Sequence, residues 1–268
     1  MDLIVESGAT KASWCLLGEG GFRTVETRGI NLAHMDQCVV APVAWEALEK
    51  LGVREEDISR VYFYAAGLID RPELPVFRAA KVEYASDLVA AARAVCGREP
   101  GIAAILGTGS NSCEWDGEKI VANFHGAGFI LGDEGSASAL GKAFVSDFLK
   151  DLVPEGIAAE FSSRFPSDYS TIVRNVYKGD APAGYLGSFA PFIMDHFGDP
   201  YVRELARENF RSFIRRTLLR YRRLPVGAVG GFGYAYQDIL REVAAEEGVE
   251  IRTVIKSPLD GLVNYHGL

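Results

Sequence analysis

The first thirty residues alternate between short apolar runs and glycine-containing turns. Residues 3–6 form a mostly apolar run typical of a buried strand, residues 7–10 carry turn-forming types, and residues 12–17 are largely apolar again. A second glycine-rich turn precedes residues 22–27, a third strand-like segment. Short apolar runs bounded by such turns are typical of paired strands. The pattern therefore predicts an antiparallel meander of three strands.

A helical pattern follows the meander. Between residues 36 and 51 apolar side chains recur at roughly helical spacing, and Gly52 follows as a stop signal. Residues 61–65 and 82–84 are short strand-like runs, and residues 87–95 form a second helical stretch. Three strands followed by helices and further strands indicate an α/β domain.

The same pattern begins again about one hundred residues later. Residues 102–106 form a buried strand, and residues 112–115 and 119–122 continue as two more. The segment IVESGAT at residues 4–10 has a counterpart in ILGTGSN at residues 105–111. This weak internal repeat indicates two related lobes.

The rest of the chain is mainly helical before strands return. Helical patterning covers residues 135–221, with a loop expected at 181–184. A strand at 228–233, a helix at 236–247 and a strand at 251–255 precede a short tail.

The two halves share no low-complexity linker, so we expect ordered hinges between them. The predicted N-terminal lobe spans residues 1–100, and the tail at 257–268 returns to it. The predicted C-terminal lobe spans residues 101–256. Each is long enough to bury a core of its own.

Composition and charge exclude several classes of function. The 268 residues are 48% hydrophobic and 24% charged, as in an ordinary globular protein, and the net charge is 28 − 36 = −8. The densest basic stretch, residues 211–223, has helical spacing and predicts a solvated face, so we expect no nucleic-acid partner. The start lacks a basic and apolar leader pattern, and no apolar run could span a bilayer. We expect a cytoplasmic protein without a membrane partner.

The cysteines and histidines point to no metal or redox centre. The four cysteines are scattered without a CxxC pair, and the four histidines lack metal-ligand spacing. Neither a zinc site nor a disulfide framework is predicted.

Two glycine-rich turns that follow buried strands are candidate phosphate sites. Glycine lets the main chain approach phosphate oxygens closely, and side-chain donors stand nearby. Each turn alone is more typical of a plain hairpin, but the pair favours phosphate binding. The run GAVGGFG at 227–233 is a third such strand end, for which tight packing is the alternative. The residues concerned in the first two turns are Gly8, Thr10, Lys11, Thr108, Gly109, Ser110 and Asn111.

Three carboxylates stand where predicted strands or turns end. Asp133 and Asp87 each precede or begin a predicted helix, where aspartate is a routine N-cap. Alternatively, Asp133 could hold a magnesium-bound water or a sugar hydroxyl, and Asp87 could act as a base. Glu6 ends a buried strand, and a carboxylate there costs free energy unless it meets a cation or donors. For Glu6 we favour a site residue.

These motifs resemble those of the BadF/BadG/BcrA/BcrD ATPase and N-acetylglucosamine kinase family within the actin/hexokinase-like superfamily. ESGATK at 6–11 is similar to its first phosphate motif, LGTGSNS at 106–112 to its second, and VGGFG at 229–233 to its adenosine motif. The most specific stretch is GAGFILGDEGS at 126–136. The resemblance spans nearly the whole chain. It implies two ribonuclease-H-like lobes with an ATP-binding cleft between them, Mg²⁺, and lobe closure on a sugar.

Residue roles follow from the resemblance alone. It implies that Asp87 is the catalytic base, that Asp133 lies near the magnesium and the sugar, and that Glu6 is the other metal-side carboxylate. Substrate contacts would come from Asn31, Asn111, Gly128 and Asp133. The nucleotide would be held by Gly8, Thr10, Lys11, Thr108, Gly109, Ser110, Gly230 and Gly231.

Two positions depart from the family pattern. Glu6 stands where the first motif usually opens with Asp, and Ala127 where N-acetylglucosamine kinases tend to carry Trp. The longer Glu6 side chain bears on the metal, and Ala127 bears on the identity of the sugar.

The sequence thus predicts a kinase that transfers phosphate from Mg-ATP to a hydroxyl of N-acetylglucosamine or a related hexosamine, with a homodimer as one option for assembly. An ATPase that activates a radical dehydratase is one alternative, although the C-terminal half carries only Cys113 as a cluster ligand. A nucleotide- or sugar-binding regulator without turnover is the other.

Overall fold

The computed structural model describes residues 1–8, 11–18, 21–30, 37–65, 77 and 80–267. They divide into two compact units, one of Met1–Arg98 with Pro258–Leu268 and one of Glu99–Ser257. We call these unit 1 and unit 2. Within the described ranges, no helix combines the length and apolarity needed to cross a membrane.

Unit 1 is built on a mixed five-stranded sheet. Its order is β3-β2-β1-β4-β5, with antiparallel pairing from β3 to β1 and parallel pairing from β1 to β5. The carboxyl ends of the three parallel strands therefore share one edge. The strands are β1 (Asp2–Ser7), β2 (Lys11–Gly18), β3 (Gly21–Arg28), β4 (Arg60–Ala65) and β5 (Lys81–Ser86).

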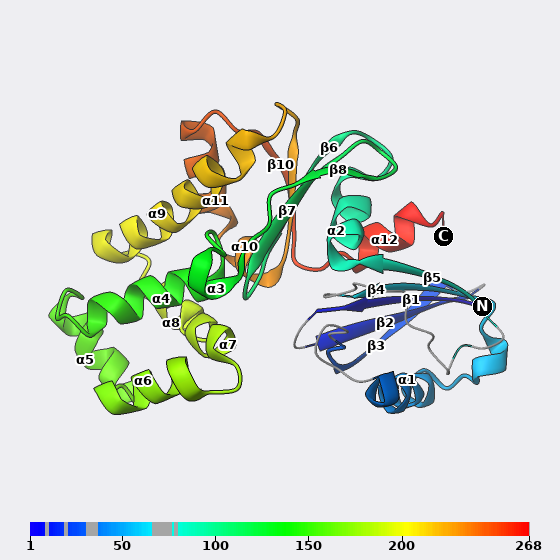
Figure 1. Cartoon of the computed structure of the whole chain (residues 1–268), viewed down its shortest axis with the longest axis horizontal. Helices are drawn as coiled ribbons and strands as arrows, with labels where there is room; N and C mark the ends of the chain where they lie inside the picture. The colour runs from blue at the N-terminus through cyan, green and yellow to red at the C-terminus, as the bar shows by residue number, and fades with distance from the viewer. Residues whose placement is uncertain (9–10, 19–20, 31–36, 66–76, 78–79, 268) are drawn as a thin grey trace. The chain divides into compact units, whose positions relative to one another are not determined.

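Helices cover both faces of this sheet (Figure 1). Because side chains alternate along a strand, Leu3 and Val5 of β1 pack on the face of α1 (Gln37–Leu51), whereas Ile4 packs with α2 (Asp87–Cys96) and α12 (Leu259–Tyr265). A short 3₁₀ turn, η1 (Glu55–Asp57), precedes β4. The alternation places Glu6 on the α2 face.

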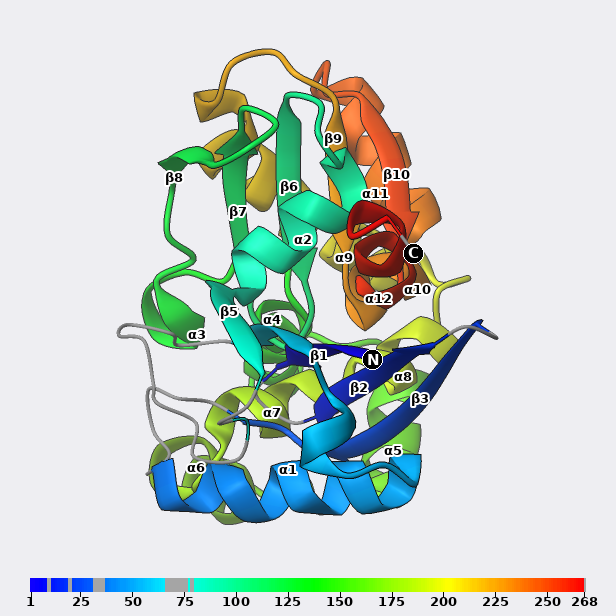
Figure 2. The same cartoon turned by 90° about the vertical axis from the view of Figure 1, so that its right-hand side faces the viewer.

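Unit 2 repeats this sheet. The order β8-β7-β6-β9-β10 has the same antiparallel and parallel pairs as unit 1 (Figure 2). The internal repeat and the α/β fold predicted from the sequence are therefore confirmed. The strands are β6 (Gly101–Leu106), β7 (Ser110–Trp115), β8 (Ile120–Asn123), β9 (Val226–Val229) and β10 (Ile251–Ile255).

A group of helices completes unit 2 and packs around an aromatic core that includes Phe144, Phe161 and Phe192. Ring pairs in this core meet edge-on or tilted, as aromatic quadrupoles favour. The elements are α3 (Gly128–Leu131), α4 (Ala137–Phe148), α5 (Glu155–Arg164), α6 (Tyr169–Lys178), α7 (Pro182–Gly187), α8 (Ala190–Asp195), α9 (Pro200–Arg216), η2 (Leu218–Arg220), α10 (Gly231–Ala235) and α11 (Gln237–Glu246).

Three local predictions were wrong. The loop expected at 181–184 is the start of α7, because Pro182 occupies the first helical turn, where its missing N–H is harmless. The strand expected to continue through 233 ends at Val229, and α10 begins two residues later. Part of the expected tail is α12, whose Leu262 is fully buried in unit 1.

The arginine stripe of α9 is more than the solvated face predicted for it. Arg207 binds Glu246 of α11 at 2.6 Å, and Arg215 binds Glu247 at 2.9 Å. Arg211 bonds to Glu208 within its own helix at 2.9 Å. These pairs link α9 to α11 along their polar sides, while their apolar sides pack on the unit 2 core.

Candidate functional site

Two carboxylates lie at the carboxyl ends of the parallel strands of unit 1. Glu6 belongs to β1, and Asp87 follows directly after β5. Both side chains are half-buried. Burial raises the pKa of Glu6 to about 7, the negative charge of Asp87 adds to the rise, and Lys11 opposes it. The two carboxylates are therefore close enough for the charge of Asp87 to affect Glu6.

Asp87 is not the cap of its helix. Ser86 caps α2, since its hydroxyl accepts a hydrogen bond from the Val89 amide at 3.3 Å. The Asp87 carboxylate accepts from the neighbouring Leu88 amide at 2.8 Å, and no side chain is found to bond to it among the described residues. Burial raises the pKa of Asp87 above its ordinary value, although this hydrogen bond opposes the rise. The carboxylate therefore keeps free acceptor positions.

The first glycine turn is only partly described. Gly8 donates to the Lys11 carbonyl at 3.0 Å and begins the β1–β2 turn. The Lys11 ammonium is exposed and pairs with Glu26 across β2 and β3 at 2.6 Å. Such a surface pair is weak, so it leaves Lys11 free to exchange partners. The predicted nucleotide residue Thr10 and the predicted sugar residue Asn31 lie outside the described residues.

The second glycine turn rests on the start of α4. The Gly107 amide donates to the Gly109 carbonyl at 3.0 Å, and the Gly107 carbonyl accepts from the Ala137 amide at 2.9 Å. The exposed Thr108 accepts from the Ser138 amide at 3.0 Å through its carbonyl. Among the described residues, no hydrogen-bond acceptor is found for the Thr108 or Gly109 amide. These two amides are the free donors of the turn.

Asp133 joins this turn to the GAGFILGDEGS segment. Asp133 is 8% exposed. Burial raises the pKa of Asp133, and hydrogen bonding with the Ser110 and Gly128 backbone works against the rise. A Cβ atom on Gly109 would lie 2.8 Å from its Oδ2, so the carboxylate needs a glycine there. The N-cap of α4 is Ser136, which accepts from the Ala139 amide at 3.1 Å. Asp133 is therefore free of the capping role.

The predicted polar side chains beside Asp133 are engaged within unit 2. The Ser110 hydroxyl donates to the Glu134 carbonyl at 2.7 Å. The Asn111 carboxamide oxygen accepts from the Ser112 amide at 2.9 Å and from the Asn123 amide group at 3.0 Å. Both side chains thus stabilise the loop through hydrogen bonds within unit 2.

The two glycines of the third motif differ in their surroundings. Gly230 has a φ of 132°, and a Cβ atom there would lie 2.3 Å from the Leu106 carbonyl oxygen, so strand packing explains it. Gly231 is exposed at the start of α10, and no atom lies within 4 Å of its built Cβ. The predicted residue Gly231 is therefore open to a ligand.

Two features of this region had no clear sequence signal. Ala127, which precedes α3, has a φ of 63°, a left-handed backbone conformation that residues other than glycine rarely adopt. Asn209 of α9 binds the loop that follows Asp133, although the two are far apart in the sequence. Asn209 lies inside a long helical pattern, so the sequence alone gives no sign of this contact.

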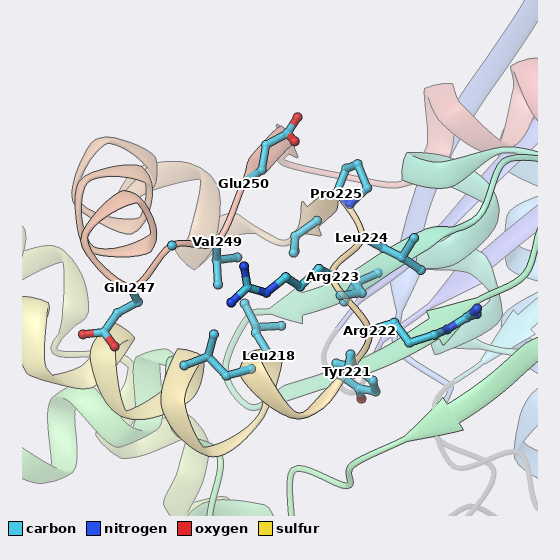
Figure 3. A pocket seen from close by; sticks show the side chains of 13 residues that line it. Leu218, Tyr221, Arg222, Arg223, Leu224, Pro225, Glu247, Val249 and Glu250 are labelled. Carbon is cyan, nitrogen blue, oxygen red and sulfur yellow. The ribbon is translucent and has the colours of Figure 1, made fainter.

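A pocket of about 350 Å³ in unit 2 contains none of the predicted residues. Ile102 and Val226, at the amino ends of β6 and β9, line it together with the side chain of Arg223, which lies across its middle (Figure 3). The glycine turns follow the opposite, carboxyl ends of these strands. Ligands of open α/β sheets bind at carboxyl ends, so we place the candidate site there.

Two mixed five-stranded sheets with the same strand order, each covered by helices, match the fold of two-lobed sugar kinases. No protein-family model matches the chain, and no curated protein does. Among solved structures, a putative N-acetylglucosamine kinase from Porphyromonas gingivalis is 37% identical with a TM-score of 0.94, over 99% of this chain and 98% of that one. The chain therefore belongs to the same sugar-kinase family as that protein.

More distant structures share the fold. A putative N-acetylglucosamine kinase from Chromobacterium violaceum is 20% identical, with a TM-score of 0.75 over 98% of both chains. A ROK family glucokinase from Streptomyces griseus, solved with glucose and AMPPNP, is 18% identical, with a TM-score of 0.56 over 98% of this chain and 97% of that one.

Proposed function

We propose that the protein transfers phosphate from ATP to a hydroxyl of N-acetylglucosamine or a related hexosamine. The observation that carries this proposal is the Asp87 carboxylate, which is half-buried at a strand end and released from capping by Ser86. The P. gingivalis relative, described as a putative N-acetylglucosamine kinase, supports the choice of sugar. Membership of the narrower BadF/BadG/BcrA/BcrD group remains a proposal.

In this proposal Asp87 is the general base. It accepts the proton of the attacking hydroxyl, by the resemblance the 6-hydroxyl, while the hydroxyl oxygen attacks the γ-phosphorus in line with the leaving ADP oxygen. A raised pKa brings the carboxylate closer to the working pH and makes it a better proton acceptor. The hydrogen bond from the Leu88 amide orients the Asp87 carboxylate through its Oδ1.

The free amides of unit 2 are the proposed phosphate donors. Thr108 and Gly109 present N–H groups without an acceptor among the described residues. Donors that are fixed before the reaction stabilise charge that develops on the transferring group. The open surroundings of Gly231 suit the nucleoside, as the family resemblance implies.

Magnesium fits the carboxylates of the proposed site. No hydrogen bond or ion pair to the Glu6 carboxylate is found among the described residues, so a half-buried negative charge there has only the more distant Lys11 to offset it. Magnesium prefers oxygen ligands and is usually held by one or two carboxylates with phosphates and waters. We propose that Glu6 and Asp133 orient its waters. Bound with the nucleotide, magnesium neutralises charge on the β- and γ-phosphates.

An ADP-release assay tests the proposal. Purified protein with Mg-ATP is offered N-acetylglucosamine, glucosamine, N-acetylmuramic acid and glucose. We expect sugar-dependent ADP formation that is fastest with an N-acetylated hexosamine. Such turnover would also rule out a regulator without catalysis. ADP formation that no sugar stimulates would refute the kinase.

A matched pair of variants tests the base. Asp87→Asn removes the proton acceptor, so we expect kcat to fall by ~10²–10⁴ while the KM for ATP stays within about twofold. The control is Asp260→Asn. Like Asp87, Asp260 lies in the first turn of a unit 1 helix, but it is exposed on α12. Full activity of Asp87→Asn would disprove the assignment.

A further inference from the structure

Asn209 of α9 holds both sides of the backbone just after Asp133. Its Oδ1 accepts a hydrogen bond from the Gly135 amide at 2.9 Å, and its Nδ2 donates to the Ser136 carbonyl at 3.0 Å. A carboxamide that pairs with an N–H and a C=O in this way fixes the plane and the direction of the main chain. The two bonds span more than seventy residues of sequence.

The same face of α9 contacts the loop at two further points. Phe213 lies one turn beyond Asn209, and a Cβ atom on Gly135 would approach its Cβ to 2.7 Å. Arg216 lies on the next turn and pairs with Glu134 at 2.7 Å. Residues spaced by four and then three positions share one helix face. Helix α9 therefore forms a continuous support beneath the loop.

Asp133 needs such a support because its backbone is strained. Its φ of 57° lies in the left-handed region, which residues other than glycine adopt only where their surroundings enforce it. The Asp133 amide donates to the Gly126 carbonyl at 2.7 Å, and its carbonyl accepts from Ser136 at 3.2 Å. Ser136 is thus bound on one side by Asp133 and on the other by Asn209.

We propose that Asn209 is a positioning residue that holds the Asp133 carboxylate in place for the phosphate transfer. This inference rests on the proposed kinase function of the same site. Among the described residues, Asn209 has no hydrogen bond to the predicted sugar residues or to the free amides of the phosphate turn, and it acts through the backbone of residues 135 and 136. The alternative is that Asn209 only stabilises the fold where α4 begins.

Three variants separate positioning from stability. Asn209→Leu removes both hydrogen bonds at similar volume. Asn209→Asp keeps the acceptor for the Gly135 amide but loses the donor to Ser136. Ile214→Val is the control, because Ile214 is a fully buried residue of α9 outside the contacts with the loop. Circular dichroism and melting temperatures establish that each variant folds.

We expect Asn209→Leu to lower kcat/KM for the sugar by ~10–100-fold, as loss of supporting hydrogen bonds typically does. The KM for ATP should stay within about twofold. Asn209→Asp should recover part of the loss, since it restores one of the two bonds. Ile214→Val should lower the melting temperature without changing either constant. Wild-type kcat/KM in Asn209→Leu, or an equal loss in Ile214→Val, would overturn the proposal.

Hydrogen exchange gives a readout that does not depend on turnover. The Gly135 amide donates to Asn209, and the Asp133 amide donates to Gly126. In Asn209→Leu both amides should exchange at least about tenfold faster, while the Val145 amide further along α4 keeps its rate. Unchanged protection of Gly135 and Asp133 would overturn the positioning role even if the wild type proved inactive toward every sugar. Lack of sugar turnover with lost protection would instead refute the kinase function alone.

Discussion

Acidification should loosen unit 1 through His266. This residue follows α12, and its Nε2 lies 2.8 Å from the Tyr64 hydroxyl of β4, while its ring stacks on Tyr62 with centroids 3.6 Å apart. Arg93 donates to the same hydroxyl at 2.7 Å. With Arg93 donating to its oxygen, the Tyr64 hydroxyl can donate its own proton to Nε2 of a neutral imidazole. Protonation of His266 at both nitrogens would remove this acceptor.

The size of the effect follows from the pKa of His266. Burial, followed by the positive charge of Arg93, lowers this pKa from 6.5 to about 4. The stabilisation is complete above pH 6.5 and is lost as the pH falls toward 4, since the unfolded chain binds the proton first. A difference of about 2.5 between the two pKa values corresponds to ~3 kcal/mol, and partial exposure of the ring reduces this to roughly 2 kcal/mol.

His266→Phe tests this reasoning, because it keeps an aromatic ring against Tyr62 but cannot take a proton. Native-state hydrogen exchange of amides in β1 and β4 reports the free energy of opening for unit 1 by itself. Between pH 7.5 and 4.5 the wild type should lose roughly 2 kcal/mol more than the variant. At pH 7.5 the variant should be less stable by about 1 kcal/mol, because the Tyr64 hydroxyl loses its acceptor.

Asn264→Ala is the control, since Asn264 is an exposed residue of α12. It should follow the pH dependence of the wild type. Equal slopes for the wild type and His266→Phe would refute a neutral, buried His266. A slope of opposite sign would show that His266 is protonated in the folded protein.

Two further substitutions test packing in unit 2. In Gly126→Ala the new Cβ would lie 1.9 Å from the Ser110 carbonyl oxygen and 2.8 Å from Asp133 Oδ1. We therefore expect a lower melting temperature together with weaker sugar binding. An unchanged melting temperature and unchanged sugar affinity would contradict the described loop. Phe161→Ala removes a fully buried ring that contacts Phe144 and Phe192 among others. Urea unfolding should show that the free energy of unfolding falls by ~3–5 kcal/mol, while kcat stays unchanged. A fall below about 1 kcal/mol would contradict the described core.

The sheets were predictable because their signal is local. An apolar run such as residues 102–106 between turn-forming residues marks a strand whatever its partners are. The repeat of residues 4–10 at 105–111 also indicated that the two halves share one fold, although it does not contain the strand order. The mixed α/β fold therefore followed from periodicity together with one internal comparison.

Short helices were not predictable in the same way. Isolated helices of five to seven residues are unstable, so α7, α10 and α12 exist because they are packed and not because of their own propensity. Leu262 of α12 is buried by contacts with α2 and β1, which lie far away in sequence. No local pattern contains those contacts.

Helix caps explain why the candidate carboxylates stayed ambiguous in the sequence. Ser86 and Asp87 are adjacent, and both are good capping residues. Asp133 and Ser136 pose the same choice at α4. In the structure the serine is the N-cap in both cases. Neither aspartate caps its helix, and burial raises the pKa of each. Which of two neighbouring residues caps a helix depends on the backbone geometry, and the spacing of residues in the sequence does not determine that geometry.

The repeat also bears on the different roles that we propose for the two units. At equivalent ends of the first strands, unit 1 carries Glu6 and unit 2 carries Gly107. A carboxylate repels phosphate and attracts a cation or a proton, whereas a glycine turn offers amide donors such as those of Thr108 and Gly109. In unit 2 the buried carboxylate beside this turn is Asp133, and hydrogen bonding with the Ser110 and Gly128 backbone opposes the rise of its pKa. The proposed assignment of proton transfer to unit 1 and phosphate binding to unit 2 follows from this asymmetry.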